Sequence, residues 1–222
     1  GGEPCVRFGH AVPSHSVVTV TITQGTRNHT WSNFAFGQFS GWVNAFVVGT
    51  GKLSVWAAGA NGTAGAAVPS GPPIFQVDIP LTPGPLVVVL KDKWPPTKPE
   101  NVETIAASYV PPKNGSAVRL FNLAPDVKSA GLQVGGKMLV DKVLYSLGSK
   151  WQPVPSVAQT FTAVDDAGVA SHPEVTMTPP LAPQVFTTFL LGSKQYGYTL
   201  VPQVDAPEYG VCKPDPSHAV EA

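Results

Sequence analysis

Charged residues are scarce in this chain of 222 residues, and their scarcity excludes several classes of protein. Aspartate, glutamate, lysine and arginine together make up 13% of the sequence, against about 25% in an average globular protein. The 14 basic residues balance the 14 acidic ones, and there is no basic stripe of the kind that binds nucleic acid. We therefore expect no nucleic-acid partner.

Long apolar runs are also missing. The longest one, Pro85 to Leu90, is far shorter than the roughly 20 residues that cross a bilayer, so we expect no membrane span. Glycine and proline contribute 22 and 24 residues, and both interrupt helices. The segments between them are rich in valine, threonine, phenylalanine and tyrosine, which favour strands. The sequence therefore predicts an all-β protein. Because it begins at Gly1 without a methionine or signal peptide, we interpret it as a mature form.

Only two cysteines are present, and they lie near opposite ends of the chain. Cys5 and Cys212 are either a disulfide pair or two free thiols. The even number and the frequent proximity of chain termini favour a disulfide. In the chain-entropy model, closing so long a loop stabilises a fold by about 4–5 kcal/mol. Because disulfides persist in oxidising compartments, the pair predicts a secreted, extracellular or cell-surface protein.

Three N-glycosylation sequons begin at Asn28, Asn61 and Asn114, more than the content of asparagine, serine and threonine gives by chance. Such sites lie on the surface of secreted proteins, and we expect all three in loops. Asn-Gly is also a common turn, so Asn61 and Asn114 fit turns without a glycan as well.

An internal repeat is the most informative feature of the sequence. Residues 5–14 align without gaps with residues 117–126, residues 34–42 correspond to 143–151, and residues 86–90 correspond to 186–190. Each copy of about 100 residues contains short strand-like segments separated by turns, which indicates a sandwich or barrel. We therefore predict two tandem immunoglobulin-like antiparallel β-sandwich domains, over residues 1–112 and 113–205. An extended C-terminal tail, held by Cys212, is expected over residues 206–222.

Local patterns support this interpretation. Alternation in residues 17–22 places Val18, Val20 and Ile22 on one face of a strand. Turn signals occur at Gln24-Gly25, at Gly49–Gly51, and at Gly135-Gly136.

Several short motifs carry a resemblance to known proteins. They are VRLFNLAPD (118–126), LQVGGKML (132–139), LYSLGSKW (144–151), and FTTFLLG followed by YGYTLVPQVD (186–205). They resemble an uncharacterised family of secreted β-sandwich domains. The two-copy layout is similar to that of the AlgF family of alginate biosynthesis accessory proteins, periplasmic factors associated with polysaccharide O-acetylation. The resemblance implies a pair of extracytoplasmic sandwiches at or near a surface glycan, and it carries over no catalytic residues.

Candidates for catalysis and metal binding are few. His10, His15 and His29 form the one histidine cluster of the sequence, and their spacing fits no zinc or copper motif, so we expect exposed loop histidines. Asp165 and Asp166 precede an Ala-Gly pair and predict a hairpin turn, although a calcium ligand role stays open. No Gly-x-Ser-x-Gly elbow is present. We therefore predict no catalytic residues, no metal and no cofactor.

Tryptophans and two arginines are the remaining candidates. Trp31 and Trp94 stand among polar or proline neighbours, so we expect them in loops as candidates for a glycan contact. Trp42 and Trp151 are equivalent in the repeat, which favours a role in the core. Arg7 and Arg119 are also equivalent, and we expect each to pack its stem while pairing with a carboxylate or carbonyl.

These observations favour a non-enzymatic extracellular structural or adhesive glycoprotein, a building block of a cell-surface, matrix or filament assembly. Its expected partners are copies of itself or other surface and matrix proteins. The alternative is a carbohydrate-binding or polysaccharide-modification accessory module. A glycan array separates the two hypotheses.

Overall fold

The computed structural model describes residues 2–57, 68–107, 115–165, 173–177, 184–205 and Cys212. These residues form strands β1 to β15 and one short 3-10 helix, η1 (Pro99–Asn101), so the prediction of an all-β protein is confirmed. The chain divides into two compact units. Unit 1 contains the described residues up to Ala107 together with Cys212, and unit 2 contains those from Gly115 to Asp205.

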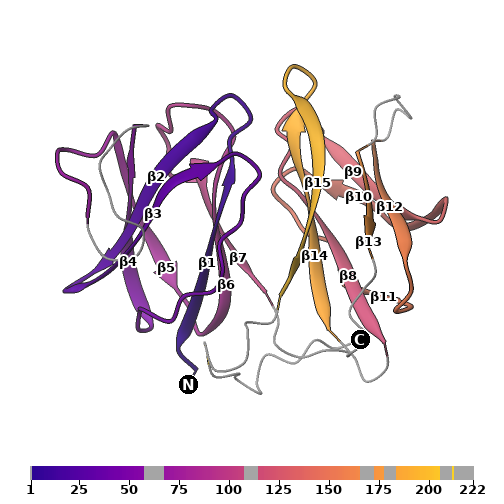
Figure 1. Ribbon diagram of the computed structural model, residues 1–222, viewed down its shortest axis with the longest axis horizontal. Coiled ribbons are helices and arrows are strands. Elements are labelled where there is room, and N and C mark those ends of the chain that lie inside the picture. The colour runs from indigo at the N-terminus through magenta and orange to yellow at the C-terminus, as the bar shows by residue number, and fades with distance from the viewer. Residues whose placement is uncertain are drawn as a thin grey trace. The chain divides into compact units, whose positions relative to one another are not determined.

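Unit 1 has two sheets (Figure 1). One has the order β1-β6-β7, in which β1 (Pro4–Ala11) runs parallel to β6 (Gly84–Lys91), and β6 is antiparallel to β7 (Val102–Ala106). The other is antiparallel, with the order β3-β2-β4-β5. Its strands are β2 (Val17–Gln24), β3 (Arg27–Ala35), β4 (Gly49–Trp56) and β5 (Phe75–Leu81).

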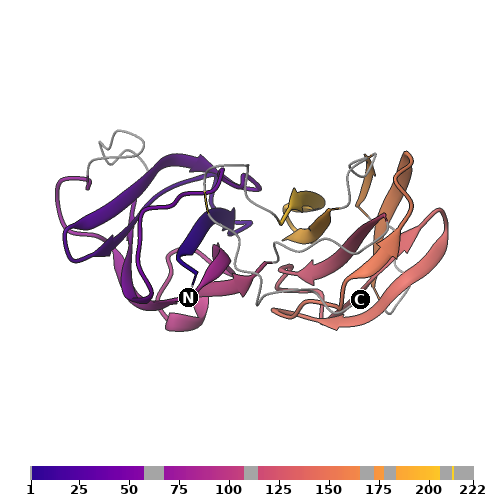
Figure 2. The same cartoon turned by 90° about the horizontal axis from the view of Figure 1, so that it is seen from below.

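Unit 2 also has two sheets, with the orders β11-β8-β14-β15 and β10-β9-β12-β13. The first contains β8 (Ser116–Asn122), β11 (Gln152–Val154), β14 (Val185–Ser193) and β15 (Gly197–Val204). The second contains β9 (Ser129–Val134), β10 (Lys137–Leu144), β12 (Gln159–Asp165) and β13 (Glu174–Met177). Again the first strand is parallel to its central partner, β8 to β14. Figure 2 shows the two sheets of each unit as separate layers.

The hydrophobic core of each unit lies between its two sheets. In unit 1 the core contains Val6 and Phe8 from β1, Val88 from β6, and the predicted row of β2, whose three apolar side chains are fully buried. In unit 2, Leu120 on β8 and Leu132 on β9 belong to one cluster. A core shared by two packed sheets is consistent with a β-sandwich.

One turn prediction is wrong, because Gly49–Gly51 does not form a turn but begins β4. Thr19 and Thr21, on the other face of β2, are fully buried like the apolar row. Gly25, by contrast, lies in the β2–β3 turn, and Gly135 and Gly136 form the β9–β10 turn, all with positive φ, a conformation that glycine adopts without strain.

The two units share the register of their central strands. Val6 pairs with Leu86 and His10 with Leu90 in unit 1. The equivalent pairs in unit 2 are Val118 with Phe186 and Asn122 with Leu190. Positions aligned in the repeat therefore occupy equivalent places in each unit.

Some predictions fall outside the described residues. Asn61, Asn114, Asp166, the expected domain boundary between residues 112 and 113, and the tail over residues 206–222 except Cys212 are among them. Within the described ranges, no helix has the length and hydrophobicity that crossing a membrane requires.

Candidate functional site

The predicted disulfide between Cys5 and Cys212 is present, with Cα atoms 5.9 Å apart. Cys5 lies near the start of β1 and is fully buried. The bond joins positions 207 residues apart in sequence, so the chain from Cys5 to Cys212 forms a single covalent loop.

The two equivalent arginines lie over the two equivalent tryptophans. The Arg7 guanidinium is 4.4 Å from the ring centroid of Trp42, and that of Arg119 is 4.1 Å from the ring of Trp151. Both distances are within the range of a cation–π interaction. Trp42 is buried and Trp151 half-buried, and neither belongs to the main core cluster of its unit. Their role is therefore to cover an arginine rather than to fill the core centre.

Arg119 also begins a buried polar chain that runs across the sheet. Its Nε donates to Thr187 Oγ1 at 2.9 Å, and that hydroxyl donates to Asp205 Oδ1 at 2.7 Å. All three residues are buried. Burial lowers the pKa of Arg119, and the negative charge of Asp205 acts in the opposite direction. Thr187 thus links Arg119 to a carboxylate, and no sequence pattern indicated Thr187 or Asp205.

Asn122 fastens the turn after β8 in unit 2. Its Nδ2 donates to the carbonyls of Val127 at 2.8 Å and Val143 at 3.2 Å, and its Oδ1 accepts from the Ala124 N–H at 3.1 Å. The side chain is fully buried. One amide therefore joins β8, its following turn and β10.

His10 occupies the same position in unit 1, and it too is fully buried. Its Nδ1 accepts from the Val12 N–H at 3.2 Å, which reproduces one of the three bonds of Asn122. Its ring and that of Phe36 are nearly perpendicular, with centroids 5.8 Å apart. Burial lowers the pKa of His10 to about 4, an effect that the backbone of His15 partly offsets.

The expectation of exposed loop histidines is therefore wrong. His10 lies in β1, and His29 lies half-buried in β3. His15 is in a loop, but it is half-buried and stacks on Trp94, with ring centroids 3.7 Å apart and planes at 4°. Burial lowers the pKa of His15 and of His29.

The same loop-to-loop contact is made in unit 2 by a carboxylate. Asp126, equivalent to Ser14, accepts from the Tyr198 hydroxyl at 2.9 Å and from the Lys194 N–H at 2.8 Å. It thereby ties the turn after β8 to the β14–β15 hairpin. Burial, followed by the bond to Asp126, raises the pKa of Tyr198 to about 12.

Two surface predictions need correction. Trp31 is not in a loop but on β3, where it is 5% exposed and packs against Phe8 with centroids 5.5 Å apart. It therefore has no free face for a sugar. Asn28 is also on β3, at its second residue and half-buried, rather than in a loop. Trp94 is half-buried, and its ring is partly covered by His15 and by the core of unit 1.

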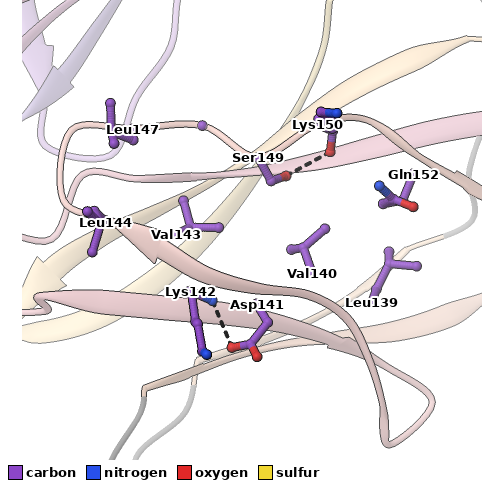
Figure 3. A pocket seen from close by; sticks show the side chains of 11 residues that line it. Leu139, Val140, Asp141, Lys142, Val143, Leu144, Leu147, Ser149, Lys150 and Gln152 are labelled. Carbon is purple, nitrogen blue, oxygen red and sulfur yellow. Dashed lines mark hydrogen bonds between the residues drawn. The ribbon is translucent and has the colours of Figure 1, made fainter.

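The surface feature that the sequence did not indicate is a groove in unit 2 with a volume of about 360 Å³. It lies between β10 and the segment leading to β11, the neighbouring edges of the two sheets. Figure 3 shows apolar side chains from β10 inside it, with Lys150 on the opposite wall. Its lining consists of Leu139, Val140, Asp141, Lys142, Val143, Leu144, Leu147, Gly148, Ser149, Lys150 and Gln152.

The rim of this groove is unusually apolar. Leu144 and Leu147 are 48% and 54% exposed, and the nearby Met138 on β10 is 48% exposed. Val140 and Val143, which belong to the core cluster, form part of its floor. The groove therefore connects an exposed apolar rim to the interior of the unit.

The edge strand beside the groove is irregular. The β9–β10 register shifts twice between Met138 and Val143, and Lys142 has a φ of 53°. Its N–H bonds Asp141 Oδ1 at 2.7 Å (Figure 3). Bulges of this kind discourage edge-to-edge strand pairing.

Within the residues that the structure describes, no three His, Cys, Asp or Glu side chains converge as metal ligands would. A comparison with models of known protein families finds no match, and a comparison with curated proteins finds no significant similarity.

Proposed function

We propose that this chain is a non-enzymatic extracellular structural or adhesive glycoprotein, built from two tandem immunoglobulin-like sandwich domains. It serves as a building block of a cell-surface, matrix or filament assembly. The observation that carries the proposal is the unit 2 groove with its exposed apolar rim. Exposed apolar patches bounded by polar groups mark sites of association.

The partner that fits the groove is a second copy of this chain. The groove carries Asp141 and Lys142 side by side on β10 and Lys150 on the facing wall. In a contact between two copies related by a two-fold axis, the same patch lies on both sides. The patch must therefore carry both positive and negative charges if charges are to pair across the contact. Here the carboxylate of one copy can meet a lysine of the other, while the leucines of both rims become buried.

An extracellular location is supported by two features. The long-range disulfide is of a kind that persists in oxidising compartments. The sequon asparagine Asn28 lies beside the exposed Gly25-Thr26 turn of the β2–β3 hairpin, a position that a glycosylating enzyme can reach.

The test is the solution mass of the intact, oxidised chain, measured by analytical ultracentrifugation over a range of concentrations. The wild type is expected to associate, and the double variant Leu144→Asp with Leu147→Asp is expected to remain monomeric. Ile74→Asp is the matched control, because Ile74 is 45% exposed and belongs to unit 1. A wild type that is monomeric at every concentration, or an equal loss with Ile74→Asp, contradicts the proposal.

The alternative, a polysaccharide-binding accessory module, now depends on Trp94, since Trp31 is buried. A glycan array with the wild type and Trp94→Ala tests it. Binding to a polysaccharide that Trp94→Ala abolishes, together with a monomeric wild type, favours the alternative over self-assembly.

A further inference from the structure

His10 and Asn122 hold equivalent turns by different chemistry. Both residues pair with a leucine of the neighbouring parallel strand, Leu90 in unit 1 and Leu190 in unit 2. The carbonyl of each accepts a backbone N–H at 2.8 Å, from Gly37 in unit 1 and from Ser146 in unit 2. The backbone around the two side chains is therefore the same.

We propose that His10 is an acid-sensitive latch for the first turn of unit 1, at the position where Asn122 holds the corresponding turn of unit 2 independently of pH. The inference does not depend on the proposed assembly function. It concerns how unit 1 responds to its surroundings.

The latch follows from the direction of one hydrogen bond. Nδ1 of His10 accepts the Val12 N–H, so it carries no hydrogen, and the proton of the neutral ring is assigned to Nε2. Adding a proton to Nδ1 would bring two donors face to face. The imidazolium therefore cannot keep the bond that fastens the turn, and it also places a charge in a fully buried site.

The surroundings of His10 offer the added charge no carboxylate partner among the described residues. On β6 and β7 the core-facing neighbours are Leu90 and Val102, both apolar. By the alternation of strands, Lys91 and Glu103 lie on the opposite face, where they pair at 2.7 Å.

On the remaining sides, the segment after β3 presents the Phe36 ring. The turn presents His15, whose backbone partly offsets the lowering of the His10 pKa and whose charge lowers that pKa further. Among these neighbours only the His15 backbone favours the imidazolium, and burial outweighs it.

Asn122 lacks this sensitivity because an amide does not titrate in this range. Its three hydrogen bonds to backbone groups also leave the turn of unit 2 held more firmly. The pair therefore predicts that mild acid opens unit 1 before unit 2.

The experiment is amide hydrogen exchange on the full, disulfide-bonded chain, following Val12 in unit 1 and Ala124 in unit 2. Their opening constants, corrected for intrinsic exchange, are compared at pH 8 and pH 5. With a folded pKa of about 4 against an ordinary value of about 6.5, the Val12 turn is expected to open about 30-fold more at pH 5. The Ala124 turn is expected to change little.

Reciprocal variants make the result specific. His10→Asn is expected to remove the acid response of Val12, and Asn122→His to create one at Ala124, while His15→Ala leaves most of it in place. An acid response of Val12 that persists in His10→Asn overturns the proposal.

If a variant fails to fold, NMR titration of the wild-type protein tests the proposal independently. A His10 imidazole that titrates near 6.5 in the folded chain overturns the proposal, and titration near 4 supports it.

Discussion

Gly9 on β1 pairs with Phe39 through an isolated β-bridge, and a Cβ added at Gly9 would collide with the Phe39 ring. In unit 2 the same two positions hold Phe121 and Gly148, with the aromatic ring and the glycine exchanged. A Cβ at Gly148 would lie 2.7 Å from the Phe121 ring. One ring therefore fills this space in each unit. It comes from the segment after β3 in unit 1 and from β8 in unit 2.

This exchange predicts a compensating pair of substitutions. Gly9→Phe alone places two rings in one space and is expected to destabilise unit 1 by about 1–3 kcal/mol or more. Gly9→Phe combined with Phe39→Gly reproduces the arrangement of unit 2 and is expected to recover most of that loss. Denaturant unfolding of the oxidised protein measures both. If the double variant is as unstable as the sum of the single variants, the two positions are not coupled in this way.

The sequence could predict the features that depend on local pattern. The density of glycine and proline and the β-branched segments indicated an all-β chain, and the alternation in residues 17–22 identified the core row of β2. The two cysteines indicated their disulfide. The repeat aligned His10 with Asn122, although nothing in either copy showed that both positions are buried.

Two bulges explain why other core residues were missed. Trp31 and Phe34 both face the core of unit 1 although they are three residues apart, because Asn33 adopts a φ of 50° and the β2–β3 register shifts there. Val140 and Val143 show the same spacing beside Lys142. A bulge inserts one residue and shifts the alternation of buried and exposed residues by one position. A two-residue pattern therefore could not assign Trp31 to the core.

His10 was misassigned for a different reason. Every residue of β1 is buried, so both faces of the strand are covered, and a polar residue in it does not mark an exposed position. The Arg119–Thr187–Asp205 chain was out of reach because Arg119 and Thr187 are 68 positions apart. Long-range polar contacts leave no local pattern.

Tyr198→Phe is expected to loosen the hairpin of unit 2. The variant loses the hydrogen bond to the Asp126 carboxylate, which we expect to cost about 1 kcal/mol. Thermal unfolding measures the loss. The matched control is Tyr196→Phe, which is expected to have no effect because Tyr196 is 55% exposed at the tip of the same hairpin. Equal losses in the two variants would show that the bond to Asp126 does not hold the hairpin.

The same bond predicts an alkaline titration. Because the folded protein holds the Tyr198 proton up to a pKa of about 12, against an ordinary value of about 10, its contribution to stability is complete below about pH 10. That contribution is lost as the pH rises through about 12. Ultraviolet titration is expected to show a late-ionising tyrosine that is lost in Tyr198→Phe, and Asp126→Asn is expected to lower its pKa. A late phase of unchanged amplitude in Tyr198→Phe contradicts the assignment.

Reduction of the disulfide is expected to destabilise the protein strongly. The loop between Cys5 and Cys212 spans 207 residues, for which the chain-entropy model gives about 5 kcal/mol. Thermal unfolding with and without a reductant measures the effect. The double variant Cys5→Ser with Cys212→Ser is expected to unfold like the reduced wild type and to be insensitive to reductant. Equal stability of the oxidised and reduced wild type would show that the bond contributes little.

Two adjacent threonines of β14 should respond in opposite ways to the same substitution. Thr187 Oγ1 accepts from Arg119 and donates to Asp205, so Thr187→Val leaves two buried ionic groups without their bridge and is expected to cost about 2–4 kcal/mol. Thr188 is equally buried, and its Oγ1 has no hydrogen-bond partner within the described residues. Replacing an unpaired buried hydroxyl by a methyl group removes a desolvation penalty, so Thr188→Val is expected to be neutral or stabilising. Chemical unfolding of both variants distinguishes a polar bridge from simple packing, because packing alone predicts the same small change at both positions.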